Sequence, residues 1–171
     1  VLTHGQSMTD VVHEVLPELP EYIHLIGADE KVNTYDLIEV ADLGLVYTTT
    51  VGMEMAMNGL PVVVTGQTHY RGRGFTYDPD SWVGYFKLMG QIIAKPAAYR
   101  LSREQVEKAW AYAYRFFFDF PRPYPWHSVR LWDDVGARPM EYVLSDEGMQ
   151  KYGNTFRYLV GDPLDWSQVQ A

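Results

Sequence analysis

Two polar stretches contain the residues best suited to chemistry, and the first has two hydroxyls, a glycine and a carboxylate at close spacing. Thr49 and Thr50 stand just before Gly52 and Glu54. The exposed N–H groups of a helix's first turn attract phosphate, and threonine hydroxyls add donors. Gly52 lets the backbone approach a ligand closely, and the Glu54 carboxylate is placed to accept ribose hydroxyls. This spacing predicts a site for a nucleotide phosphate, although capping, close packing and the helix dipole explain the same residues.

The second stretch, residues 67–76, is rich in glycine and basic side chains. Arg71 and Arg73 are predicted to neutralise the phosphate of a leaving nucleotide, because arginine forms paired hydrogen bonds with phosphate oxygens. His69 is the best candidate here for a polar contact or an acid, although a loop histidine is more often structural. The sequence shows no cluster of metal-ligating residues, so we expect no metal and no other cofactor.

The order of the predicted helices and strands around these stretches indicates an α/β fold. Four short apolar runs are predicted as strands, at residues 1–4, 22–26, 43–47 and 61–65. Three helices are predicted between them, at residues 10–16, 34–41 and 51–58, and Asn33 or Thr34 is expected to cap the second. Continuous apolar strands that alternate with helices are typical of a parallel sheet covered on both faces. We therefore predict a Rossmann-like parallel sheet with flanking helices, in which both polar stretches lie at the carboxyl ends of strands.

The remainder of the chain is predicted to be helical at first and then irregular. Asp78 and Pro79 suggest the start of a helix that ends near residue 93, and Ser102 begins a capping box for another. Trp110 with Phe116, Phe117 and Phe118 is interpreted as a core stripe. We expect an irregular, aromatic-rich C-terminal extension with one short helix near residues 146–152. The predicted division is residues 1–100 as a Rossmann-like nucleotide-sugar-binding domain and residues 101–171 as a helical C-terminal extension packed on it.

Composition narrows the classes of protein. The net charge of −8 over 171 residues argues against a nucleic-acid-binding surface, which needs a basic face. The chain has no cysteine, which excludes a disulfide framework and a thiolate metal site. No apolar run reaches the length of a bilayer, so a cytoplasmic protein is expected, with peripheral association at the inner face of the membrane as an option. The abrupt start at Val1 suggests a fragment of a larger protein.

The stretch from about residue 35 to residue 78 resembles the capsular polysaccharide biosynthesis family, whose members are two-domain GT-B glycosyltransferases. The resemblance rests on Tyr47-Thr-Thr-Thr-Val-Gly-Met-Glu54, on Gly59-Leu-Pro-Val62, and on a following loop with a tyrosine and spaced glycines. Two positions depart from the pattern: Thr49 replaces a serine and Leu60 replaces a lysine. The stretch is more distantly similar to the C-terminal domains of other GT-B enzymes and of UDP-N-acetylglucosamine 2-epimerases.

The resemblance implies that this chain is the donor-binding half of a glycosyltransferase for surface or capsular polysaccharide. Thr49, Thr50 and Gly52 would contact the donor phosphate and Glu54 the ribose of a nucleotide-sugar. The saccharide acceptor and the catalytic base would belong to a missing N-terminal domain, so the chain alone is expected to be inactive. Two alternatives remain open: a nucleotide-sugar 2-epimerase, and a non-catalytic module of a polysaccharide assembly or export complex.

Overall fold

The computed structural model describes residues 5 and 7–163. By their internal contacts the residues fall into two compact units, Val1–Asp42 and Leu43–Ala171, and each is described by itself. The division expected at residue 100 stays a prediction. Among the described residues, no helix is both long enough and apolar enough to cross a bilayer.

The first unit contains two short helices. Helix α1, Met8–Val15, begins with a capping box in which the Ser7 hydroxyl accepts from the Asp10 N–H and the Asp10 carboxylate accepts from Ser7. Helix α2, Thr34–Val40, is capped by Asn33, one of the two cap residues expected, whose side-chain oxygen accepts from the Tyr35 N–H at 3.1 Å.

The strand predicted at residues 22–26 is wrong, because this segment is turn and coil. Tyr22, Ile23 and Ile26 are exposed, and the described part of this unit contains no strand with which the segment could pair. A strand needs a partner for its backbone hydrogen bonds, so an apolar run alone does not form one. The strand predicted at residues 1–4 lies outside the described residues.

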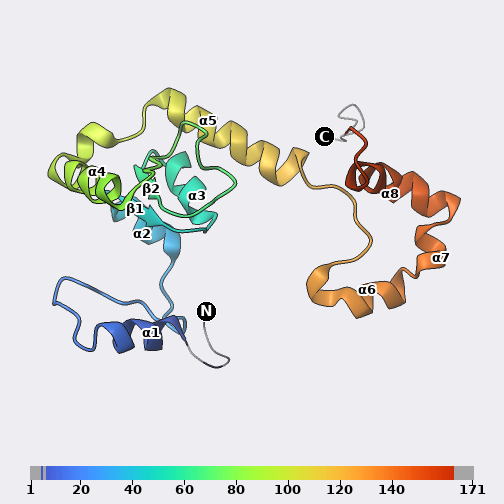
Figure 1. Ribbon diagram of the computed structural model, residues 1–171, viewed down its shortest axis with the longest axis horizontal. Helices are drawn as coiled ribbons and strands as arrows, with labels where there is room; N and C mark the ends of the chain where they lie inside the picture. Colours follow the sequence, from blue (N-terminus) through green and yellow to red (C-terminus); the bar gives the residue numbers. More distant parts are fainter. Residues whose placement is uncertain (1–4, 6, 164–171) are drawn as a thin grey trace. The chain divides into compact units, whose positions relative to one another are not determined.

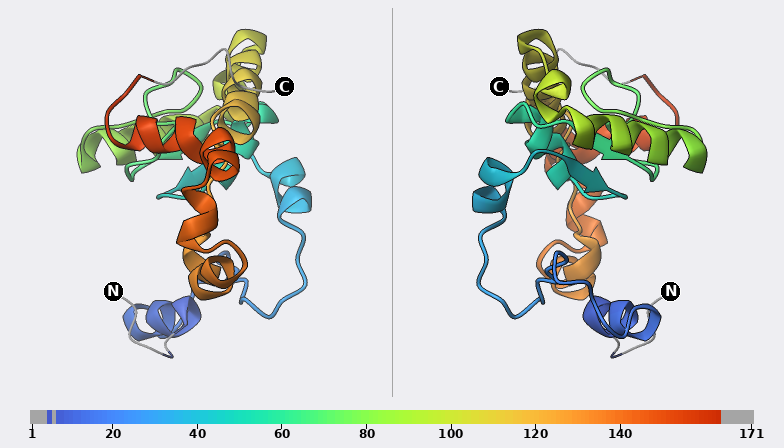
Figure 2. Two further views of the ribbon diagram at one scale, coloured as in Figure 1. Left: turned by 90° about the vertical axis from the view of Figure 1, so that its right-hand side faces the viewer. Right: turned by 90° about the vertical axis from the view of Figure 1, so that its left-hand side faces the viewer.

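The second unit is built on a small parallel sheet. Strand β1, Gly44–Val46, leads through helix α3, Val51–Met57, to strand β2, Val62–Val64. The two strands pair in parallel, with Gly44 opposite Val62, and lie side by side in each view (Figures 1 and 2). Tyr77 adds a single parallel bridge to Val63 on the β2 edge. The chain is therefore a mixture of helices and a small parallel sheet, smaller than the four strands expected.

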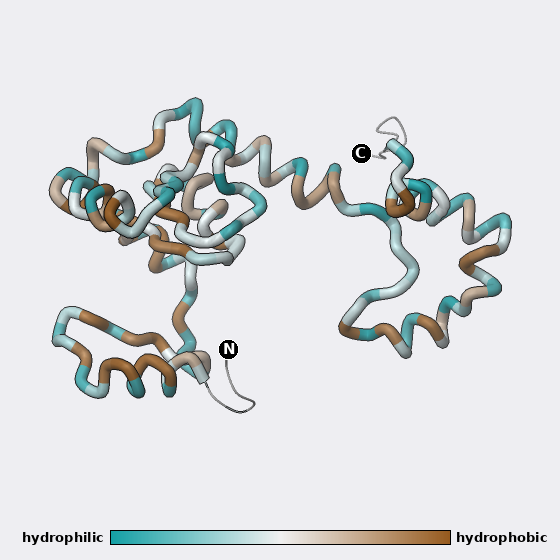
Figure 3. The backbone as a smooth tube through the Cα atoms, in the orientation of Figure 1, coloured by the Kyte–Doolittle hydropathy of each residue, from teal (hydrophilic) through white to brown (hydrophobic). Residues whose placement is uncertain are grey.

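The core of this unit forms around β2 and α3. All three β2 residues are fully buried, and the tube through the strands is coloured as hydrophobic in Figure 3. Helix α5, Arg103–Tyr114, packs on α3 and contributes Ala109 and Ala113. Two aromatic side chains of the loop after β2, Tyr70 and Phe75, are also buried in this core. This burial fixes the loop against both α3 and α5.

Helix α4, Trp82–Ala94, begins later than predicted. Its cap is Ser81, whose hydroxyl accepts from the Gly84 N–H. Asp78 instead stays in the loop, where its carboxylate accepts from the Gly72 N–H at 2.7 Å and from the Thr76 hydroxyl at 2.9 Å. A carboxylate committed to its own loop does not cap a helix, which explains the shift in the helix start.

The chain then continues through the 3₁₀ turn η1, Pro96–Tyr99, to α5, whose capping box at Ser102 is confirmed. At its C-terminal end α5 widens into a π-helical turn, η2, Arg115–Asp119, closed by the Phe120 N–H bonding to the Arg115 carbonyl at 2.7 Å.

Residues 128–159 are mainly helical, which corrects the expectation of an irregular extension, although the short helix expected near residues 146–152 is present within a longer one. Its elements are η3, Ser128–Arg130; α6, Leu131–Ala137; α7, Met140–Val143; and α8, Asp146–Leu159. Proline-rich coil precedes them, and it is tied back by side chains. The Arg138 guanidinium donates to the Pro125 carbonyl and to the Asp134 carboxylate, while the Thr155 hydroxyl donates to the Pro123 carbonyl at 2.8 Å. The prolines obscured these local helices in the sequence.

Candidate functional site

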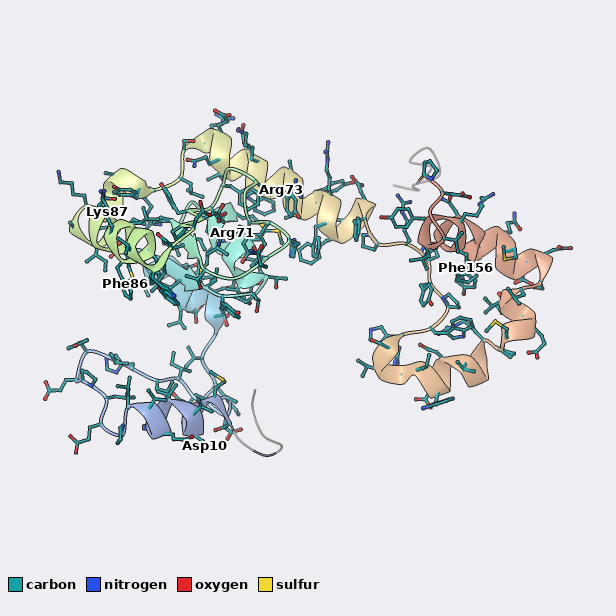
Figure 4. All side chains as sticks on the ribbon, viewed as in Figure 1. Asp10, Arg71, Arg73, Phe86, Lys87 and Phe156 are labelled. Atoms are coloured by element: carbon teal, nitrogen blue, oxygen red, sulfur yellow. The ribbon has the colours of Figure 1, made fainter. Side chains whose placement is uncertain are left out.

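Arg71 holds the loop after β2 together. Its guanidinium donates to the carbonyl of Val64 at 2.6 Å and to that of Pro79 at 2.7 Å, and it pairs with the Asp80 carboxylate at 3.5 Å. The side chain is only 16% exposed, and Figure 4 shows it inside the loop. These bonds join the end of β2 to the start of α4. The structure thus gives Arg71 a structural role where the sequence suggested contact with a phosphate.

Gly52 is a close-packing position. A Cβ atom at this residue would overlap the hydroxyl of Tyr70 and would lie 2.9 Å from the Val46 Cγ2 atom. Gly52 is itself buried. The space in front of this glycine is therefore filled by the protein, and the packing explanation accounts for its presence without a ligand.

Thr49 and Thr50 remain exposed at the start of α3. The Thr49 hydroxyl accepts from the Val51 N–H at 3.3 Å, and the Thr49 carbonyl accepts from the Tyr70 hydroxyl. Thr50 is the cap residue, but within the described structure its side chain forms no capping bond. Glu54 is half-buried one turn further on. A ligand contact for Thr49, Thr50 and Glu54 stays a prediction.

A large pocket opens where the loop after β2 meets α5 and the π turn. It has a volume of about 970 Å³, and it is lined by His69, Arg73, Tyr112, Arg115, Phe116, Asp119 and Phe120. Two of these seven residues, His69 and Arg73, were singled out from the sequence. The other five come from the helical segment at and after the end of α5, and only Phe116 among them was named from the sequence, as part of a core stripe.

Ring stacking forms one wall of the pocket. His69 stacks on Phe116 with ring centroids 3.9 Å apart and an angle of 4° between the planes. Phe116 is also nearly parallel to Tyr112, at 10°, and to Phe120, at 6°. The Arg73 guanidinium carbon lies 5.7 Å from the centre of the Tyr112 ring, a cation–π distance. The wall therefore offers flat apolar surface beside positive charge.

The tautomer of His69 follows from its hydrogen bonds. The Tyr112 hydroxyl donates to the His69 carbonyl at 2.7 Å, so its only proton is used there. The same hydroxyl lies 3.1 Å from His69 Nδ1, which must then be the donor. Nε2 consequently keeps its lone pair and can accept a hydrogen bond. Partial burial of the ring lowers the pKa of His69, which favours this neutral form.

The charges of the pocket suit an anion with a hydroxylated part. Arg73 and Arg115 supply two cations, and Asp119 supplies one carboxylate that can accept hydrogen bonds from hydroxyl or amino groups. Figure 4 shows Arg73 on the side of its loop that faces α5, away from Arg71. The described residues include no group of three or more metal-ligating side chains placed to hold an ion.

One feature of the sequence could have indicated that the α5–η2 segment lines this pocket. The predicted core stripe is wrong for Trp110, Phe117 and Phe118, which are exposed, whereas Phe116 is half-buried against the core. An aromatic run flanked by Arg115 and Asp119 is unusual for a core, because charged residues at both ends require solvent.

Comparison of the chain with protein-family models, with curated proteins and with solved structures finds no match.

Proposed function

We propose that this chain binds a nucleotide-sugar and forms the donor-binding half of a GT-B type glycosyltransferase. The observation that carries the proposal is the pocket that Arg73 and Arg115 line together with the stacked rings of His69 and Phe116. A nucleotide joins a flat base to an anionic phosphate, and this wall offers a surface for each part. Its volume of about 970 Å³ is within the usual range of small-molecule sites.

The position of the pocket supports the same reading. In open parallel sheets, ligands bind outside the carboxyl ends of the strands. The loop that carries His69 and Arg73 follows the carboxyl end of β2, and the β1–α3–β2 crossover is the repeating unit of a Rossmann-like sheet. In this proposal the base stacks beside Phe116, the phosphates pair with the arginines, and Asp119 accepts a ribose hydroxyl.

In this proposal the chain binds the sugar donor but does not catalyse sugar transfer by itself. The acceptor saccharide and the catalytic base belong to a second domain, and the reaction takes place at the cytoplasmic face of a membrane where the polysaccharide is assembled. Thr49, Thr50 and Glu54 are kept as further donor contacts at the start of α3. In this proposal the nucleotide-sugar is the substrate, and the side chains named above contact it directly.

Titration calorimetry with UDP, GDP, CMP and their sugar conjugates tests the proposal. At least one should bind with a Kd below about 1 mM. The Arg73→Ala, Arg115→Ala double variant should weaken it at least tenfold, because each charge-assisted bond contributes about 1.5–3 kcal/mol.

Lys108→Ala is the matched control, since Lys108 lies on α5 outside the pocket and pairs with Glu104 in solvent. It should leave the affinity unchanged. If no nucleotide binds, or if both variants lose affinity equally, the pocket is not a nucleotide site. If the chain converted UDP-N-acetylglucosamine without an acceptor, the proposed activity would be that of an epimerase and not of a transferase.

A further inference from the structure

Helix α4 presents an apolar face to solvent. Trp82, Phe86 and Ile93 are 70%, 59% and 65% exposed, and Val83 beside them is 79% exposed. Positions separated by four and seven residues fall on one side of an α-helix, at 100° per residue. Ile92, which lies roughly 100° around the helix axis from these three residues, is buried. The helix is thus attached by one face and offers the other.

The aromatic rings on this face are already assembled. The Trp82 and Phe86 rings stack with centroids 6.1 Å apart, and Tyr85 meets both of them edge-on. Rings held by their neighbours lose little conformational freedom when a partner covers them. This arrangement is suited to docking.

Positive charge surrounds the apolar face. Between Asp80 and Arg103 the chain contains Lys87, Lys95 and Arg100 but no acidic residue, in a protein of net charge −8. Lys87 follows Phe86 directly, both side chains are exposed, and both are labelled on α4 in Figure 4. A partner that is complementary to this segment must therefore offer both apolar surface and negative charge.

We propose that α4 lies in the plane of a bilayer that contains anionic lipids, with Trp82 and Phe86 inserted between the headgroups. Tryptophan is favoured at that depth because its ring is apolar and its N–H is polar. Lys87 and Lys95 then meet lipid phosphates. A second copy of the chain is a poorer partner, because two such faces would oppose lysine to lysine.

Flotation of the 171-residue chain with vesicles tests this proposal. Vesicles with 30% phosphatidylglycerol should carry the protein, and vesicles of pure phosphatidylcholine should carry at least fivefold less. The Trp82→Ala, Phe86→Ala variant should lose at least tenfold in bound fraction, and Lys87→Glu should lose several-fold. Raising the salt concentration should weaken binding, because it screens the lysines.

Trp132→Ala is the control. Trp132 is 83% exposed but stands next to Asp133 and Asp134, so its removal should leave flotation unchanged. The proposal is overturned if anionic vesicles do not bind the chain or if both tryptophan variants lose binding equally. It is also overturned if light scattering shows a dimer that Trp82→Ala, Phe86→Ala dissociates. None of these measurements involves a nucleotide, so they test membrane binding independently of the proposed binding of a nucleotide-sugar.

Discussion

The Tyr70 hydroxyl donates a hydrogen bond of 2.5 Å to the backbone carbonyl of Thr49. The bond joins the loop after β2 to the loop after β1, so the two segments at the carboxyl edge of the sheet are held as one piece. Tyr70 is fully buried, and burial raises the pKa of its hydroxyl, which therefore stays protonated and remains a donor.

Replacing Tyr70 by phenylalanine should destabilise the second unit by about 1 kcal/mol, because the Thr49 carbonyl loses its partner while the ring still fills the core. Urea unfolding followed by circular dichroism measures the change. Tyr114→Phe, at an exposed position on α5, is the control and should have no effect. Equal unfolding midpoints for Tyr70→Phe and the wild type would show that this bond does not stabilise the fold.

Gly52→Ala should cost about 1–3 kcal/mol of stability, because the added methyl group meets Tyr70 and Val46 in a filled core. The matched control is Gly90→Ala on α4, where nothing lies within 4 Å of the new atom. That change should instead stabilise by up to about 1 kcal/mol through helix propensity. A neutral Gly52→Ala would mean that the space is open to a ligand after all.

The two arginines of the loop should separate into different phenotypes. Arg71→Ala removes short bonds to the Val64 and Pro79 carbonyls and should destabilise the protein by about 2 kcal/mol. Arg73→Ala should change stability by less than about 0.5 kcal/mol, because the side chain is exposed, yet it should weaken nucleotide binding. Unfolding curves and calorimetry on both variants check this. The reverse assignment of effects would restore Arg71 as the phosphate contact.

The lowered pKa of His69 predicts a pH-dependent gap in stability between the wild type and His69→Phe, which keeps the stacking on Phe116. At about pH 7.5 and above, roughly one unit over the ordinary His pKa, the ring is mostly neutral in both folded and unfolded chains, and the gap is nearly constant. As the pH falls further, the unfolded chain takes up a proton at His69 more readily than the folded one does, so the wild type loses stability. His69→Phe lacks this loss, and the gap moves in its favour. Urea midpoints at pH 7.5 and 5.5 measure it; a gap that does not change with pH contradicts the shift.

The predictable parts of the fold were those with local signals. The cap at Asn33, the capping box at Ser102 and the β1–α3–β2 order follow from side chains within a few residues of one another. The predicted strand at residues 22–26 failed because pairing depends on a partner far away in the chain. Elements η3, α6 and α7 were missed because they are short and prolines precede them, whereas α8 covers the helix expected near residues 146–152.

The candidate site was predictable only on its loop side. His69 and Arg73 stand out as polar residues after a strand, and both line the pocket. Phe116 was assigned to a core stripe and Arg115 was not considered, because helical spacing alone does not tell which face of the α5–η2 segment meets the loop. The sequence was also insufficient for Arg71. Its charge suggested a bound phosphate, but in the structure its guanidinium donates to backbone carbonyls at the two ends of its own loop.

The π turn at the end of α5 has a geometric consequence for the pocket wall. In an α-helix, residues four apart drift by about 40° around the axis, so a third ring in the series would turn away from the first two. The wider turn at Arg115–Asp119 rotates the chain less per residue, which offsets that drift. Phe120 therefore stays aligned with Tyr112 and Phe116, and a single-residue deletion in this turn would dismantle the wall while leaving each remaining pocket side chain chemically intact.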